Sequence, residues 1–151
     1  MTLAPSNTDI LLYRGNAWSA LQQYQRSLDD YSEGIKKDPR RADLWIARGA
    51  IYSDKLGEYN RAISDFRQAS SLDPNDGNAS IDIAIASYKD QRYDTSLVWC
   101  DKAIAHGKPI GYLVKSLSYY RKHDFPSAAR EARLAKDAGI SVPDSLVRIR
   151  Q

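Results

Sequence analysis

The chain has 151 residues, of which 42% are hydrophobic and 27% are charged, and its formal net charge is +3. These values are typical of a folded globular protein that is long enough to bury a substantial core. No stretch approaches the roughly 18 uninterrupted apolar residues that a membrane-spanning helix needs, so we expect no membrane span.

The beginning of the chain gives no sign of export. Residues 1–8 are polar and include Pro5, and no basic residue precedes Arg14. A secretory signal needs a charged region followed by an apolar one. We therefore expect the chain to be cytoplasmic, although a processed product would have the same appearance.

Charge is distributed unevenly along the chain. Residues 102–151 hold 10 Lys and Arg against 4 Asp and Glu, whereas the first 101 residues hold 12 against 15. A basic segment can attract nucleic acid, anionic lipid or an acidic protein. The basic residues are spaced out, without a run of five or six, so a solvated helical surface is the simpler interpretation. We do not expect nucleic-acid binding.

Four similar repeats follow one another along the chain, at about residues 8–41, 42–76, 77–108 and 109–140. Four positions hold residues of a similar kind in every repeat, and we call each such set a column: Gly15, Gly49, Ala84 and Ser116; Tyr24, Tyr59, Tyr93 and Phe125; Ser27, Ala62, Ser96 and Ala128; Gly34, Ala69, Ala103 and Ala135. A fixed period of this kind predicts a repeat architecture.

Each repeat is predicted to be a pair of helices. Apolar residues recur at intervals of three and four, as in an amphipathic helix. In the second repeat a break at residues 55–58 contains Gly57, which is suited to a helix end. Neither helix can bury its apolar stripe alone, so the repeats are expected to stack, with about three as the minimum.

One segment of the third repeat gives conflicting signals. In residues 80–86, polar or small residues alternate with apolar ones with period two, and isoleucine is frequent, which favours a strand. The repeat register places the first helix of the repeat there, and a lone strand in a helical stack would have no edge to pair with. We predict a helix.

Both ends of the array carry signals of their own. Gly139 followed by Ile140 is typical of a helix C-cap, and Pro143 is expected to open a capping helix over about residues 142–150. Its apolar residues would cover the last repeat: Val142, Leu146, Val147 and Ile149. Residues 3–7 resemble residues 72–76, the closing stretch of a repeat. Met1 therefore lies either inside a longer array or at the start of a short natural leader.

These columns resemble the tetratricopeptide repeat (TPR) over about nine-tenths of the chain. The second repeat carries most of the family pattern: Trp45, Gly49, Tyr52, Gly57, Tyr59, Ala62, Phe66, Ala69 and Pro74. The resemblance implies an all-α fold, a right-handed α-solenoid of four helix–turn–helix repeats with a C-terminal capping helix. It implies a single domain over residues 1–151.

Catalytic chemistry finds no support in the sequence. Cys100 is the only cysteine, and among apolar neighbours it is predicted to be a small buried hydrophobe. His106 and His123 fall in turns of different repeats, without a partner at ligand spacing. No glycine-rich phosphate loop follows a strand. We predict no enzyme activity, no metal and no cofactor.

The resemblance implies that partner peptides lie on the concave face, which the first helix of each repeat lines. The positions it implies as partner-binding are Leu12, Tyr13, Asn16, Ile46, Ala50, Asp54, Ile81, Asp82, Ile85, Tyr88, Leu113, Val114, Leu117, Tyr120 and Arg121. Alternatively, tight curvature or the chain's own end fills this trough, and these residues belong to the core.

The same resemblance bears on the partner. Co-chaperones of the family grip the carboxylate of heat-shock chaperones with Lys, Arg and Asn side chains, and the corresponding positions here are Leu12, Asn16, Ala47, Asn78 and Asp82. Only Asn16 matches, and Asp82 would repel a carboxylate, so we do not expect this clamp. Acidic residues border the trough at Asp9, Asp43, Asp54 and Asp82. They favour an apolar helical or extended segment with basic flanks.

Three functions remain open from the sequence. The first is a non-catalytic protein–protein interaction module, an adaptor or scaffold. The second is a small chaperone that shields a hydrophobic client. The third is a structural fragment of a longer array that associates end to end. Self-association is possible, and if it persists when the groove is altered it favours the third function.

Overall fold

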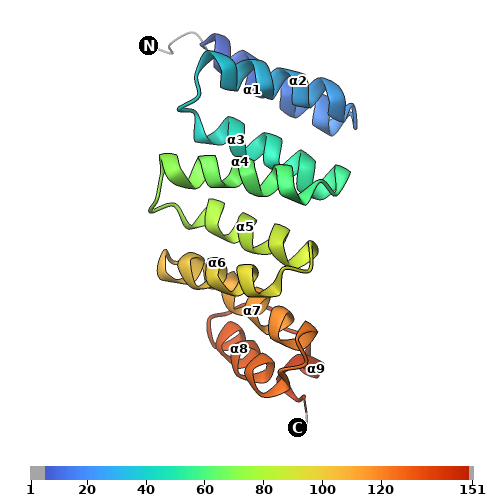
Figure 1. The fold of residues 1–151 in the computed structure, drawn as a ribbon, viewed down its shortest axis with the longest axis vertical. Helices are drawn as coiled ribbons and strands as arrows, with labels where there is room; N and C mark the ends of the chain where they lie inside the picture. Colours follow the sequence, from blue (N-terminus) through green and yellow to red (C-terminus); the bar gives the residue numbers. More distant parts are fainter. Residues whose placement is uncertain (1–5, 150–151) are drawn as a thin grey trace. The chain divides into compact units, whose positions relative to one another are not determined.

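The computed structural model describes residues 6–149 and is all-α over that range, without a strand (Figure 1). The expectations about residues 1–5, namely the absence of a signal and the leader or internal start, lie outside the described residues. The helices are α1 Asn7–Ala20, α2 Tyr24–Lys37, α3 Ala42–Ile51 with the π-helical turn η1 Tyr52–Leu56, α4 Tyr59–Leu72, α5 Gly77–Lys89, α6 Tyr93–Ala105, α7 Ile110–Arg121, α8 Phe125–Asp137 and α9 Asp144–Val147.

The chain divides into two compact units, residues 1–73 and 74–151. In the first unit, α1 pairs with α2 and α3 with α4, and α2 packs against α3. In the second unit, α5 pairs with α6 and α7 with α8, while α6 packs against α7 and α9 against α8. The predicted helical hairpins are confirmed, and residues 80–86 are helical within α5. The repeat register therefore overrides the local alternation of residues 80–86.

The turn inside each hairpin contains one residue in the left-handed region. The four residues, with their φ angles, are Gln22 (58°), Gly57 (66°), Gln91 (62°) and His123 (60°). Only Gly57 has the residue type that this conformation favours. The turn conformation is thus common to all four hairpins, although glycine is not.

In each hairpin the two helices approach closely at the column of small residues formed by Gly15, Gly49, Ala84 and Ser116. A Cβ built on Gly15 would lie 2.5 Å from the ring of Tyr31, and one on Gly49 would lie 2.7 Å from the ring of Phe66. In the second unit the residues at these two positions are Ala84 with Cys100 and Ser116 with Ala132. An aromatic ring thus faces glycine in the first unit, and small residues occur at both positions in the second.

A buried hydroxyl joins the two helices of three hairpins. The bonds are Ser27 Oγ to the Gly15 carbonyl (2.7 Å), Ser96 Oγ to the Ala84 carbonyl (2.8 Å) and Ser116 Oγ to the Ala128 carbonyl (2.8 Å). In the last hairpin the serine lies on the first helix and the carbonyl on the second, the reverse of the other two. The bond is kept while the residue that donates it changes helix.

A cation on the first helix also pairs with a buried carboxylate on the second. The pairs are Arg14 with Asp30 (2.6 Å), Arg48 with Asp65 (2.8 Å) and Lys115 with Glu131 (3.5 Å). The third hairpin has Ile83 and Trp99 at these two positions. An apolar pair thus replaces an ion pair in one repeat.

The end of the array differs in part from the prediction. The predicted C-cap is confirmed: Gly139 has φ 80°, and the Ile140 N–H donates to the Ala135 carbonyl at 2.9 Å. The last helix, however, covers only Asp144–Val147, with Pro143 as its N-cap, instead of about 142–150. Residue 150 lies outside the described range. Nucleating a helix is costly and short helices are marginal, so only the turn that buries Leu146, which is 8% exposed, is helical.

Candidate interaction surface

The expected partner-binding residues of the first unit differ widely in exposure. Tyr13 is 64% exposed, and Leu12 is half-buried against the core of Leu28, Tyr31 and Leu44. The remaining four are Asn16 and Asp54, which are exposed, and Ile46 and Ala50, which are half-buried. The Asn16 side-chain oxygen accepts a 2.7 Å hydrogen bond from the Tyr31 hydroxyl.

Two expected residues of the second unit belong to the core. Ile81 is 7% exposed and Val114 6%, and both lie in a cluster with Ala84, Cys100 and Ala103. Their burial agrees, for these positions, with the alternative that part of the trough is core. Ile85 and Tyr88 pack partly against the cluster, and Asp82 and Leu113 are half-buried.

Four other expected residues line one cleft of about 550 Å³ in the second unit: Tyr88, Leu117, Tyr120 and Arg121. The rest of its wall comes from Phe125 at the start of α8 and from the C-terminal segment: Pro143, Ser145, Leu146 and Ile149. The repeat register thus indicates four of the lining residues, while the C-terminal ones come after the last repeat. From the sequence, Leu146 and Ile149 were predicted only to cover the last repeat as part of the capping helix, and nothing in the sequence indicates a cleft there.

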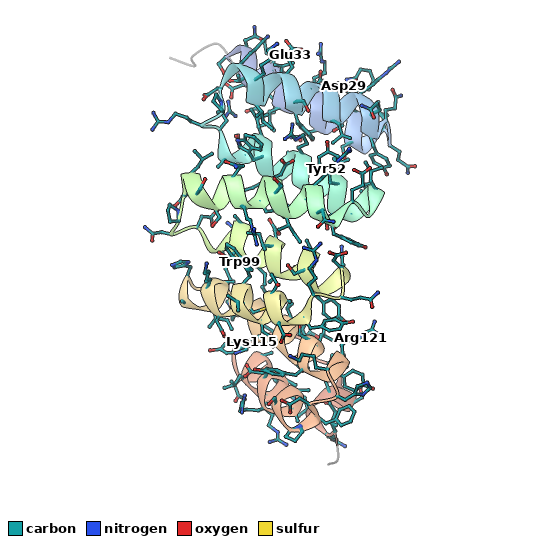
Figure 2. The ribbon with its side chains drawn as sticks, in the orientation of Figure 1. Asp29, Glu33, Tyr52, Trp99, Lys115 and Arg121 are labelled. Atoms are coloured by element: carbon teal, nitrogen blue, oxygen red, sulfur yellow. The ribbon has the colours of Figure 1, made fainter. Side chains whose placement is uncertain are left out.

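The cleft is predominantly aromatic and aliphatic, with one cation at its edge. Tyr120 is 45% exposed, and its ring centroid lies 5.6 Å from that of Phe125 in an edge-on arrangement. Arg121, labelled in Figure 2 at the end of α7, donates from Nε to the Tyr88 hydroxyl oxygen at 3.3 Å. This hydrogen bond is the largest cause of the raised pKa of Arg121. The guanidinium is therefore a permanent cation beside an apolar surface.

The acidic border predicted from the sequence is partly neutralised within the protein. Arg41 pairs with both Asp9 and Asp43 at 2.6 Å. Hydrogen bonds from the Ser6 hydroxyl and then from Arg41 lower the pKa of Asp9 to about 2. These two carboxylates already have cationic partners in the folded chain, so they offer less attraction to basic residues of a partner.

The groups suited to acid–base or metal chemistry are dispersed. His106 and His123 are exposed, and Cys100 is fully buried, which raises the pKa of its thiol to about 12. Within residues 6–149, no three His, Cys, Asp or Glu side chains are grouped so as to hold a metal ion. Over the same range, no helix has both the length and the apolar character required to cross a bilayer.

Repeated helical hairpins with a common turn and a common small-residue contact define the class of helical repeat proteins. Residues 50–109 match the family model for the tetratricopeptide repeat. Together with the repeat register and the fold, this match shows tetratricopeptide repeat sequence over these residues.

Several known proteins are similar to the chain. It is 25% identical over 134 residues to small glutamine-rich tetratricopeptide repeat-containing protein 2 of Saccharomyces cerevisiae, which is 89% of this chain and 37% of that protein. It is 26% identical over 102 residues to Hsp70-Hsp90 organizing protein 1 of Glycine max, 68% of this chain and 18% of that protein. The chain therefore spans well under half of the length of the curated relatives that it matches.

Among solved structures, MamA from Desulfovibrio magneticus RS-1 has a similar fold, with a TM-score of 0.80 and 19% identity. The match covers 88% of this chain and 76% of that one. At this identity the likeness concerns the fold. The tetratricopeptide repeat match over residues 50–109 supports a protein–protein interaction module.

Proposed function

We propose that this interaction module binds an apolar helical or extended segment of another protein in the cleft of the second unit. The observation that carries the proposal is the lining of the cleft, where the exposed ring of Tyr120 and the side chain of Leu117 lie beside Phe125 and Leu146. Tyrosine is favoured at interaction hot spots. A volume of about 550 Å³ lies in the range of known ligand sites and would accommodate one or two large side chains.

The charges support a modified view of the partner. Basic flanks were expected because of four acidic residues, of which Asp9 and Asp43 are paired with Arg41. The cation at the cleft itself is Arg121. A carboxylate on the partner, next to its apolar side chain, would complement this guanidinium with a charge-assisted hydrogen bond. We therefore retain the apolar segment and place an acidic residue beside it.

The alternatives remain within the same class of function. The name of the Glycine max relative refers to the chaperones Hsp70 and Hsp90, which favours a chaperone-related partner. The clamp positions of this chain do not carry the required basic residues, so such a partner would be bound by its apolar side chains. A role without catalysis, in the cytoplasm, agrees with this proposal. A structural fragment that stacks end to end would instead leave the cleft without a ligand.

The test is selection of a displayed peptide library against the full chain, followed by titration of the enriched peptides by fluorescence anisotropy. Tyr120→Ser should weaken binding by about tenfold or more, because a hot-spot side chain is lost. Leu134→Ser is the matched control, since Leu134 is 40% exposed on α8 and does not line the cleft. If the peptides bind the Tyr120→Ser variant as tightly as the unchanged protein, the cleft is not the binding site.

A second pair of variants tests the charge. Arg121→Met should weaken peptides that contain a carboxylate and leave neutral peptides unaffected, whereas Arg133→Met on the exposed surface of α8 should change neither. If the selected peptides are instead rich in Lys and Arg, and Arg121→Met does not change their affinity, the partner has basic flanks and no acidic residue beside its apolar side chain.

A further inference from the structure

Two arginines of the first unit show how this chain holds a carboxylate. Arg14 donates to Asp30 from Nε at 2.8 Å and from Nη2 at 2.6 Å. Arg48 donates to Asp65 from the same two nitrogen atoms, at 2.8 Å each. A guanidinium group can hold a carboxylate along either of two edges, one formed by Nε with an Nη and one formed by the two Nη atoms. Both arginines use the edge that contains Nε.

Arg121 in the cleft of the second unit uses its Nε differently. This nitrogen atom donates to the Tyr88 hydroxyl oxygen at 3.3 Å, and the guanidinium lines the cleft. Among residues 6–149, no carboxylate takes part in the contacts of Arg121. A neutral hydroxyl therefore occupies the Nε edge, and the edge formed by Nη1 and Nη2 is the one that an anion can use.

The ring of Tyr88 is itself held in place by the second unit. It packs partly against the core cluster that contains Ile81 and Ala84. Its centroid also lies 5.8 Å from that of Tyr93 at the start of α6. Arg121, in contrast, is exposed at the end of α7, and an arginine side chain has many rotamers to lose. A hydroxyl on a fixed ring thus restricts the guanidinium of an otherwise flexible side chain.

We infer that Tyr88 is a positioning residue of the cleft and that it determines how the cleft takes a carboxylate of the partner. The Tyr88 hydroxyl holds Nε of Arg121, so that Nη1 and Nη2 bind the carboxylate end-on. A guanidinium that is ordered before the partner arrives loses less conformational entropy on binding. This ordering favours an Asp or Glu side chain over the amide of the same shape, because only the carboxylate forms two charge-assisted hydrogen bonds. The inference rests on the proposed function and deepens it.

The opposite role for Tyr88 leads to a different outcome. If the hydroxyl only competed for Nε, its removal would free the edge that Arg14 uses for Asp30, and a carboxylate would bind more tightly. If the hydroxyl positions Arg121, its removal weakens the binding of a carboxylate. Tyr88→Phe separates the two roles because it removes the hydroxyl and keeps the ring.

The probes are two peptides that differ in one functional group. One is the tightest carboxylate-containing peptide from the displayed-library selection, and the other carries Asn in place of its Asp, or Gln in place of its Glu. Fluorescence anisotropy with the full chain gives the ratio of their affinities. Tyr88→Phe should reduce this ratio about fivefold, since Arg121 must then be ordered on binding, and should leave the affinity of the amide peptide unchanged. Tyr112→Phe is the matched control, because Tyr112 lies on α7 and does not line the cleft.

A second measurement needs no peptide. In proton–nitrogen NMR spectra of the arginine side chains, the Nε signal of Arg121 is identified by its absence from the Arg121→Met variant. A hydrogen bond to the Tyr88 hydroxyl should slow the exchange of this Nε proton with water. Tyr88→Phe should therefore raise the exchange rate severalfold, and Tyr112→Phe should leave it unchanged.

The outcomes separate this inference from the proposed function. A ratio of affinities that stays the same or rises with Tyr88→Phe would overturn the inference, as would an Nε proton that exchanges equally fast in both proteins. An equal loss of affinity for both peptides would show that Tyr88 only supports the fold of the cleft, and would overturn it too. All three results leave the proposed function intact. Peptides that bind Tyr120→Ser as tightly as the unchanged protein would instead contradict the cleft, and the inference with it.

Discussion

The two compact units build the same hairpin from different residues. In residues 1–73 a glycine faces an aromatic ring, Gly15 under Tyr31 and Gly49 under Phe66. In residues 74–151 the same two positions hold Ala84 and Cys100, then Ser116 and Ala132. In both arrangements at least one of the two residues is small, which lets the helix backbones approach closely. A glycine with a ring fills more volume than two small residues do, so the hairpins share the close approach and not the summed volume.

The polar contacts of the hairpins lead to a similar conclusion. Arg48 and Asp65 form an ion pair in the first unit, and Ile83 with Trp99 occupies the equivalent positions in the second. Replacing a buried ion pair by well-packed apolar residues is often neutral in stability, whereas removing one partner is costly. What the position requires is that buried charge be balanced or absent.

The largest expected effect comes from breaking that balance in the first unit. Arg48→Met leaves Asp65, which is 4% exposed, as an uncompensated buried charge and should lower the free energy of unfolding by about 3 kcal/mol. Arg48→Met with Asp65→Leu imitates the apolar pair of the third hairpin and should recover more than half of the loss. Urea denaturation measures both. If the double variant is no more stable than the single one, an apolar pair cannot replace the ion pair at these positions.

A smaller loss is expected from adding volume to the glycine contact. Gly49→Ala places a methyl group 2.7 Å from the Phe66 ring and should cost about 2 kcal/mol by overpacking. The cost should fall in a Phe66→Leu background, where the ring is absent, as the thermodynamic cycle of the two changes would reveal. An equal cost in both backgrounds would show that the ring is not its cause.

The small contact of the second unit makes its stability sensitive to alkaline pH. Burial raises the pKa of Cys100 from its ordinary 9.0 to about 12. Between these values the unfolded chain loses the thiol proton and the folded chain keeps it, so folding becomes less favourable as pH rises, by at most about 1.4 kcal/mol per pH unit. Below pH 9 this contribution is fully present. Cys100→Ala should show a shallower decline in unfolding free energy between pH 9 and 10.5, and parallel declines would contradict the prediction.

The smallest effect is expected at the turn that all hairpins share. Gly57 has a φ of 66°, and Gln22, Gln91 and His123 adopt nearly the same angle in the other turns. An added Cβ at Gly57 would meet no atom within 4 Å. Gly57→Asn should therefore change stability by only about 0.5 kcal/mol, since asparagine tolerates the left-handed region. A loss above that of Gly49→Ala would show that the first unit depends on this glycine.

Much of the fold could be predicted because it depends on periodic features. The columns at Gly15, Gly49 and Ala84 fix the register, and the register correctly outweighs the alternating pattern within α5. The family resemblance correctly indicates a repeat protein of the interaction class. The final helix was predicted too long, because a proline and a few apolar residues do not determine how many turns tertiary contacts will stabilise.

The proposed sites could be predicted less completely. The register indicates Tyr88, Leu117, Tyr120 and Arg121, but it also selects Ile81 and Val114, which are core. Positions on one helix face share a register whether or not a neighbouring helix covers them, so periodicity does not separate a groove from a core. The use of these surfaces in binding remains a proposal.

By itself, the sequence determined the number of repeats, their helical hairpins, the turn at Gly57 and the C-cap at Gly139, since each depends on local backbone preference and on a repeated apolar pattern. Only the tertiary structure decided that Tyr31 covers Gly15, that Leu146 and Ile149 complete a cleft with Tyr120, and that the Tyr88 hydroxyl accepts from Arg121. Contacts between distant segments depend on side-chain volume and on which neighbour lies against each face, and neither is encoded in the period of the repeat.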